Sequence, residues 1–295
     1  MKTKVCFVGQ HFYFGKQVER DLDEFYDVRW MELTRGVTSN WQELLEVEAE
    51  IFVFFMPHQV PPEVRDALTG EIVAVHAEPL PKFVRGQYMS SQDLQGRLGA
   101  LCPGLGAFRH FYHHDKTSFA VLERDGGRAK EFISAIATGT YYPRELPKRW
   151  DLIFIGRESS YRLFIMLPAK HIFGGRLLHI AHGIAGEELN WVLNSSVIGI
   201  NAHIENIPAL ENRLQTYMAC GLLVLSEPLS HNDFFKPGVH FVEFRGREEL
   251  IEKAAYYLKH VEERQVIAQA GYDLVVSELA AKVKWPKLID EVLGT

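Results

Sequence analysis

The sequence has few cysteines and no long hydrophobic run. Its three cysteines, Cys6, Cys102 and Cys220, are odd in number and widely separated, which favours reduced, buried thiols and a cytoplasmic setting. No run of about 18 apolar residues occurs, so no transmembrane helix is expected. The first apolar run is interrupted by Gly9, Gln10 and His11. It therefore predicts a first strand rather than a signal peptide.

The sequence also has no excess of positive charge. The formal net charge is −6 at pH 7, which does not favour a general nucleic-acid-binding surface. We find no internal repeat of short period and no low-complexity tract. With 295 residues, 47% of them hydrophobic and 24% charged, the chain is expected to form two ordinary globular domains.

Short apolar segments alternate with helical ones along the chain. The first half has expected strands at residues 4–8, 28–31, 51–55, 72–75, 108–112 and 118–122, and the second half at 151–155, 177–180, 197–200, 222–225 and 240–244. Repeated strand-then-helix order predicts an α/β fold with two Rossmann-like domains. Ligands of such open sheets bind at the carboxyl ends of the strands.

Residues 140–150 are rich in proline and charge and have no clear period, so they form the expected interdomain linker. The predicted boundaries are residues 1–148 for the first domain and 149–281 for the second. A final amphipathic helix is expected over 282–295.

Residues 211–279 contain the most specific order of elements. A helix containing Arg213 ends in Ala219-Cys220-Gly221, and an apolar strand follows. A loop ending in Phe235-Lys236-Pro237-Gly238 comes next, then a strand and a helix that begins near Glu248-Glu249-Leu250. This order resembles the donor-binding half of GT-B glycosyltransferases, in particular the family-4-like group that includes the CgeB-type spore-maturation proteins. The resemblance covers roughly residues 150–280.

The resemblance implies two Rossmann-like domains facing across a cleft, with the acceptor on the first and the nucleotide sugar on the second. It implies transfer of a sugar from a nucleotide-sugar donor to an acceptor hydroxyl, without a metal or a further cofactor. It also implies that the final helix crosses back to the first domain. The sugar, the nucleotide base and the stereochemical outcome stay open, and so does the acceptor: a glycan, a lipid-linked glycan, a protein or a small molecule.

A donor diphosphate needs cationic side chains and exposed backbone N–H groups. Gly156 and Arg157 follow a predicted strand, and Arg213 occupies the place of an arginine in the resembling proteins. The full set of predicted donor-binding residues is Gly156, Arg157, His182, Asn201, His203, Glu211, Arg213 and Thr216. For each the alternative is structural: turn chemistry for Asn201 and His203, or an ion pair of Arg213 with Glu211 or Glu205.

Thr216 departs from the family pattern. The resembling proteins have a glutamate three residues after the arginine, and that glutamate commonly holds the donor ribose. The threonine hydroxyl of this sequence can also bond a ribose, but less strongly than a carboxylate.

In the first domain His76 is the main candidate for catalysis. It directly follows a predicted strand, and the resemblance places a histidine or an acidic residue facing the transferred sugar there. Glu78 is the candidate acid–base partner. Gln10, His11 and His58 also follow strands and are predicted to line the acceptor side. The alternative for His76 is a hydrogen-bonded loop histidine.

The run His110-Phe111-Tyr112-His113-His114-Asp115 has the residue types of a metal site. Strand alternation is expected to place His113 and His114 on opposite faces, and we predict no metal. Two functions besides glycosyl transfer stay open: a non-catalytic GT-B-like protein that binds nucleotide sugars, and a sugar-nucleotide epimerase of the same architecture.

Overall fold

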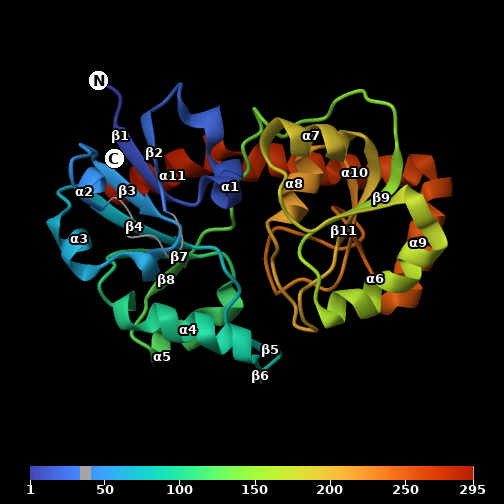
Figure 1. The fold of residues 1–295 in the computed structure, drawn as a ribbon, viewed down its shortest axis with the longest axis horizontal. Coiled ribbons are helices and arrows are strands. Elements are labelled where there is room, and N and C mark those ends of the chain that lie inside the picture. The colour runs from blue at the N-terminus through green and yellow to red at the C-terminus, as the bar shows by residue number, and fades with distance from the viewer. Residues whose placement is uncertain (34–40, 295) are drawn as a thin grey trace. The chain divides into compact units, whose positions relative to one another are not determined.

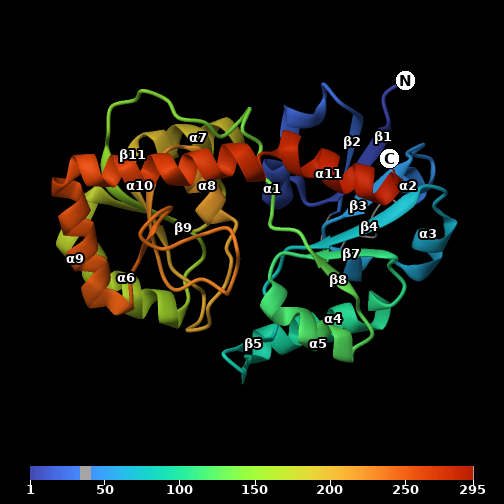
Figure 2. The ribbon, with the colours of Figure 1, turned by 180° about the vertical axis from the view of Figure 1, so that it is seen from behind.

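The computed structural model describes residues 1–33 and 41–294. The chain divides into two compact units (Figures 1 and 2). Unit 1 contains Met1–Ala135 together with Ala281–Thr295, and unit 2 contains Ile136–Ala280.

The described residues of unit 1 form a six-stranded parallel sheet in the order β2-β1-β3-β4-β7-β8. Its strands are β1 (Lys4–Gly9), β2 (Asp27–Glu32), β3 (Ile51–Phe54), β4 (Glu71–His76), β7 (His110–His113) and β8 (Ala129–Glu131). A separate antiparallel hairpin pairs β5 (Lys82–Val84) with β6 (Gln87–Met89).

Helices cover both faces of this sheet (Figure 1). They are α1 (His11–Phe14), α2 (Trp41–Leu45), α3 (Pro62–Ala67), α4 (Gln92–Leu105), α5 (Phe119–Arg124) and α11 (Ala281–Leu293). Alternate residues of β1 bury opposite faces: Phe7 packs with α11, whereas Val8 packs with α2 and α3. Burial on both faces explains why the strands are continuous apolar runs.

Unit 2 has a five-stranded parallel sheet in the order β10-β9-β11-β12-β13. Its strands are β9 (Trp150–Ile155), β10 (Leu177–Ile180), β11 (Ser196–Asn201), β12 (Leu223–Ser226) and β13 (Val242–Glu243). Its helices are α6 (Ser160–Phe173), α7 (Gly186–Asn194), α8 (Arg213–Ala219), α9 (Gly246–Lys259) and α10 (Val261–Leu274), with a π-helical turn at Val275–Leu279. The two sheets confirm the predicted α/β class.

A glycine in β11 sets the position of α8. The ring of Tyr217 lies against Gly199 so closely that a Cβ at this position would be 2.5 Å from the ring. The Tyr217 hydroxyl accepts a hydrogen bond from the backbone N–H of Ile155 at 2.9 Å. The helix is thereby tied across β11 to the end of β9, and its first residue, Arg213, lies near that strand end.

The segment predicted as a linker, residues 140–150, belongs to unit 2. Tyr141 is buried, and its hydroxyl accepts from the backbone N–H of Gly186 at 2.9 Å. Asn190 and Asn194 of α7 accept from the backbone N–H groups of Tyr142 and Arg144. These side-chain hydrogen bonds hold the segment on α7, so the division falls at Ala135/Ile136 rather than at 148/149.

Residues 118–122 were predicted as a strand, and that prediction is wrong. Asp115 accepts from the backbone N–H of Thr117 at 3.0 Å, which starts a helical turn that continues into α5. Asp115 thus caps the start of a helical turn, as aspartate commonly does. This cap outweighs the apolar pattern that predicted a strand at residues 118–122.

The three cysteines are free, and Cys6 and Cys220 are buried, as predicted. Burial raises the pKa of the Cys6 thiol to about 12. Within residues 1–33 and 41–294, no helix has the length and apolar character needed to span a bilayer.

Trp285 anchors α11 in the core of unit 1. It is fully buried, contacts the rings of Phe7 and Phe132, and donates its indole N–H to the Gln17 carbonyl at 2.6 Å.

We expect Trp285→Ala to lower the free energy of unfolding by about 3–5 kcal/mol, because it leaves a cavity the size of a large aromatic side chain. Urea denaturation measures this loss. The exposed Tyr256→Ala substitution on α9 is the control and should change stability by less than about 0.5 kcal/mol. A similar small loss for Trp285→Ala would contradict the assignment of α11 to the unit 1 core.

Candidate functional site

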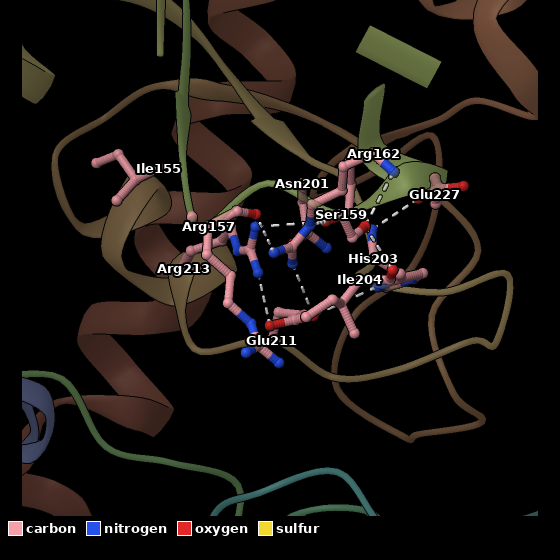
Figure 3. Close-up of polar contacts among 12 residues, drawn as sticks. Ile155, Arg157, Ser159, Arg162, Asn201, His203, Ile204, Glu211, Arg213 and Glu227 are labelled. Carbon is pink, nitrogen blue, oxygen red and sulfur yellow. Dashed lines mark hydrogen bonds and ion pairs between the residues drawn. The ribbon is translucent and has the colours of Figure 1, made fainter. Parts of the chain in front are cut away.

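A cluster of charged and hydrogen-bonded side chains lies at the carboxyl ends of the strands of unit 2. It gathers the loop after β9, the first turn of α6, the loop after β11 and the start of α8 (Figure 3). This edge is where parallel α/β sheets bind ligands.

Two arginines form the centre of the cluster. The guanidinium groups of Arg162 and Arg213 lie over the ring of Phe154, 5.3 and 5.2 Å from its centroid. Both also donate to the Ala202 carbonyl, at 3.0 and 3.3 Å. A third contact of Arg162, from Nη1 to the Arg157 carbonyl at 2.9 Å, ties the arginine to the loop after β9.

One carboxylate joins the two arginines. Glu211 Oε2 accepts from Arg213 Nη2 at 2.7 Å, and its Oε1 lies 3.5 Å from Arg162 Nη2. Burial alone would raise the pKa of Glu211, but Arg213, His203 and Arg162 together hold that pKa well below its usual value. Burial, followed by the repulsion of Arg213, lowers the pKa of Arg162 to about 10. At neutral pH the three groups therefore carry two positive charges and one negative.

Gly156 brings the backbone close to both arginines. Its φ is +154°, and a Cβ at this position would be 3.0 Å from Arg213 Nη1 and 3.3 Å from Arg162 Nη1. Its carbonyl accepts from His179 Nε2 at 2.8 Å. Because glycine has no side chain here, a ligand can approach the backbone and the guanidinium groups at the same point.

A second buried carboxylate lies after β12. Glu227 accepts from the backbone N–H of His203 at 2.6 Å and from the hydroxyl of Tyr161. His203 Nε2 lies 2.9 Å from the Pro228 carbonyl. Since a carbonyl only accepts, this nitrogen carries a proton.

The structure thus brings together four of the predicted donor-binding residues: Gly156, His203, Glu211 and Arg213. Asn201 lies at the same edge, at the end of β11. Its amide donates to the Ser226 hydroxyl at 2.9 Å, and its buried Oδ1 has no hydrogen-bond partner within the described part of the chain.

The three remaining predicted donor-binding residues are Arg157, His182 and Thr216. The side chain of Arg157 is exposed, and so is that of His182 in the loop after β10. Thr216 is buried, and its hydroxyl donates to the Asn212 carbonyl at 3.0 Å, one turn earlier in the chain. This local bond is typical of threonine within a helix.

The sequence reasoning missed Arg162 and Glu227. Arg162 lies five positions after Arg157, within the first turn of α6, where a cation opposes the helix dipole. An arginine at this unfavourable position is the feature of the sequence that could have indicated a functional role for Arg162. Glu227 directly follows the buried strand β12, and the rule that ligands bind at the carboxyl ends of strands would have found it.

Unit 1 has a different cluster at the carboxyl ends of β4 and β7. His113 donates from Nδ1 to the His76 carbonyl at 2.8 Å, and His114 Nδ1 lies 3.4 Å from the same oxygen. The rings of His113 and His114 are 4.6 Å apart. The prediction that they lie on opposite faces is therefore wrong, because β7 ends at His113 and the alternation stops there.

Two histidines of the unit 1 cluster, His76 and His113, are neutral at pH 7. Burial, with smaller contributions from His113, His114 and His58, holds the pKa of His76 well below its usual value. Burial, then His114, lowers the pKa of His113 to about 3. Among the described residues, no group of three or more His, Cys, Asp or Glu side chains is arranged to hold a metal ion.

The other residues predicted in unit 1 lie at the same edge of the sheet. Glu78 forms an ion pair with Arg97 of α4. His58 is partly buried, with its ring 6.4 Å from that of His76. Gln10 precedes α1, and the exposed His11 meets the Trp30 ring edge-on at 4.9 Å.

We expect acid to destabilise unit 1. Below about pH 6.5 an unfolded histidine takes up a proton that His76 and His113 do not, so each lowers stability by about 1.4 kcal/mol per pH unit as the pH falls. For His113 this continues towards about pH 3. Urea unfolding at several pH values, with β1 and β3 followed by hydrogen exchange, measures the slope.

His113→Asn keeps a donor at the Nδ1 position and should reduce this slope. The exposed His171→Asn on α6 is the matched control and should leave it unchanged. An unchanged slope in His113→Asn would contradict the depressed pKa.

Comparisons with known proteins agree with this picture. Residues 158–289 match a family model described as Glycosyl transferase-like. A comparison with curated proteins gives no match. Solved structures match over nearly the whole chain.

A sucrose-phosphate synthase from Thermosynechococcus elongatus has 10% identity and a TM-score of 0.68, covering 99% of this chain and 100% of that one. HepE of Anabaena, in complex with UDP and glucose, has 10% identity and a TM-score of 0.67, with the same coverage. A glycosyltransferase of avilamycin A biosynthesis, AviGT4, has 11% identity, a TM-score of 0.62 and 99% coverage of both chains.

This chain has the GT-B fold. The match of residues 158–289 to the glycosyl transferase-like family model supports a transferase. The predicted fold is thus confirmed, and the second half of the chain is similar to a glycosyl transferase-like family.

Proposed function

We propose that this chain is a glycosyltransferase that moves a sugar from a nucleotide-sugar donor to an acceptor hydroxyl without a metal ion. The observation that carries the proposal is the pair of guanidinium groups, Arg162 and Arg213, beside Gly156 at the carboxyl edge of the unit 2 sheet. A family match over the same unit supports it.

The arrangement suits a diphosphate. Guanidinium groups bind phosphate oxygens through two parallel hydrogen bonds, and the glycine lets the phosphate reach backbone N–H groups. The N-terminus of α6, a helix of 14 residues, adds a partial positive charge. In glycosyl transfer the leaving diphosphate gains negative charge in the transition state, so fixed cations at this place accelerate the step.

UDP-sugars are the donors to test first. Structures of HepE hold UDP and UDP-glucose, and the fold is shared over the whole chain. The sugar and the base recognised by this chain stay open. The acceptor we propose is a glycan, a lipid-linked glycan or a small molecule, and the setting is the cytoplasm. The CgeB-type subfamily remains a proposal on the sequence pattern.

On the unit 1 side, we propose that His76 acts on the transferred sugar. Its lowered pKa leaves the imidazole neutral at pH 7. The ring can therefore accept a proton or a hydrogen bond, but it is not an imidazolium that could act as a general acid. Glu78 is held by Arg97, which makes it the weaker candidate for proton transfer.

A non-catalytic nucleotide-sugar-binding protein is the second candidate. Thr216 stands in place of the family glutamate, and its hydroxyl already donates to the Asn212 carbonyl. This favours a protein that binds nucleotide sugars without catalysis. Incubation with a panel of UDP-, GDP-, CMP- and dTDP-sugars, with mass spectrometry of sugar products, separates the two. Transfer or donor hydrolysis supports the enzyme, whereas binding without turnover across the panel supports the second candidate.

We expect Arg213→Lys to weaken UDP-sugar binding by roughly 10- to 100-fold. Lysine cannot form the paired hydrogen bonds of a guanidinium group with a phosphate, and the loss of such a charge-assisted interaction costs about 1.5–3 kcal/mol. Isothermal titration calorimetry measures the dissociation constant. Arg247→Lys is the control, because Arg247 is on α9 and pairs with Glu248 away from the cluster. Equal affinities for the two variants would argue against a diphosphate at Arg213.

His76→Asn should lower kcat by at least about 100-fold, the lower end of general acid–base effects. The dissociation constant of the donor should not change, because the proposed diphosphate site is in unit 2. Steady-state kinetics combined with calorimetry tests this. Loss of donor affinity with kcat unchanged would refute the assigned role.

A further inference from the structure

His179 of β10 has both of its ring nitrogens hydrogen-bonded, and the two bonds join three elements of unit 2. Nε2 lies 2.8 Å from the Gly156 carbonyl in the loop after β9, and Nδ1 lies 2.9 Å from Nζ of Lys170 on α6. A carbonyl only accepts and an ammonium group only donates. Nε2 is therefore the donor to Gly156, and Nδ1 is the acceptor from Lys170.

The bond to Gly156 fixes the loop that holds Arg162. A peptide unit is planar, so a carbonyl anchored on His179 sets the orientation of the peptide between Gly156 and Arg157. The next carbonyl, that of Arg157, accepts from Arg162 Nη1 at 2.9 Å. His179 thus acts on Arg162 through two successive carbonyl groups of one loop.

His179 also supports the ring on which both guanidinium groups lie. The register of the parallel strands β9 and β10 pairs His179 with Phe154, and the centroids of the two rings are 5.1 Å apart. Arg162 and Arg213 lie over that same Phe154 ring. A displacement of His179 would therefore reach the arginines through a side chain as well as through the backbone.

Lys170 holds the imidazole in one orientation. It is on the same helix as Arg162, and its Nζ also donates to Glu158 Oε1 at 3.0 Å. That carboxylate oxygen is 3.6 Å from Nδ1 of His179, which is beyond hydrogen-bond distance. The His179 side chain is only 14% exposed, so packing and two hydrogen bonds together restrict the ring. Such support from behind keeps ligand-binding groups in place before the ligand arrives.

We propose that His179 is a positioning residue of the donor site. It holds the Gly156 loop and the Phe154 ring so that Arg162 and Arg213 meet the donor diphosphate in a fixed geometry. This rests on the proposed function. His179 takes no part in making or breaking bonds. Its effect is on affinity, because cations that are already ordered need not be ordered when the ligand binds.

The test compares replacements of His179 in the full chain, with UDP-glucose, or the member of the donor panel that binds best, as the probe. His179→Gln retains an N–H donor near the Nε2 position, whereas His179→Phe retains a ring against Phe154 but has no donor. His179→Asn, whose shorter amide does not reach the Gly156 carbonyl, is a second variant without this bond. Isothermal titration calorimetry measures the dissociation constant, and urea unfolding shows that each variant is folded.

We expect His179→Phe and His179→Asn to raise the dissociation constant by about 3- to 10-fold, the effect of one lost hydrogen bond, and His179→Gln to stay within about twofold of the unaltered chain. His171→Asn, at an exposed position of α6, is the control and should not change it. In an Arg162→Lys background, His179→Phe should cost less than about twofold more, because both substitutions disturb one set of contacts.

Three results would overturn the inference. They are an unchanged affinity in both His179→Phe and His179→Asn, a loss in His179→Gln as large as that in His179→Phe, and a full additive loss in the Arg162→Lys background. In each case the unaltered chain still binds the nucleotide sugar, so the proposed function stands. Absence of binding by the unaltered chain over the whole donor panel would instead overturn the proposed function and this inference with it.

Discussion

The candidate site depends on one carboxylate, Glu211, holding two guanidinium groups side by side. Two cations in a partly buried place repel each other strongly, and burial also removes water that would screen them. Glu211 offsets this repulsion, and the Phe154 ring and the Ala202 carbonyl fix both planes. The positive charge that remains is available to an anionic ligand.

The fold supplies this geometry through backbone contacts more than through the charged residues themselves. Gly199 lets Tyr217 cross β11 and tie α8 to the end of β9, which brings Arg213 to Gly156. The first turn of α6 brings Arg162 from the other side. The two clusters also differ in electrostatic character: burial keeps His76 and His113 of unit 1 neutral at pH 7, whereas Glu211 and the two arginines of unit 2 are charged and paired.

Much of this could be read from the sequence. The apolar runs at 51–55, 72–75, 197–200 and 222–225 marked buried parallel strands, and the residues after them marked the ligand edge. Arg213, Gly156 and His203 were found by that rule and by family resemblance. The sequence could not reveal that Glu211 would join two arginines, because Arg162 reaches it from another helix. Nor could it show that Asn190 and Asn194 bind residues 142–144, since side-chain capping of a distant segment leaves no periodic pattern. Thr216 was predicted to bind the ligand from its place in a motif, and only the structure shows that its hydroxyl donates to the carbonyl of Asn212, the N-cap of its own helix.

The most direct test of this account is an experimental structure of the full chain with UDP-glucose bound. The account predicts phosphate oxygens within hydrogen-bond distance of Arg162 and Arg213, beside the Gly156 backbone, with the sugar–diphosphate at the carboxyl edge of the unit 2 sheet. A nucleotide bound elsewhere, with both arginines still paired to Glu211 and no phosphate near them, would contradict it.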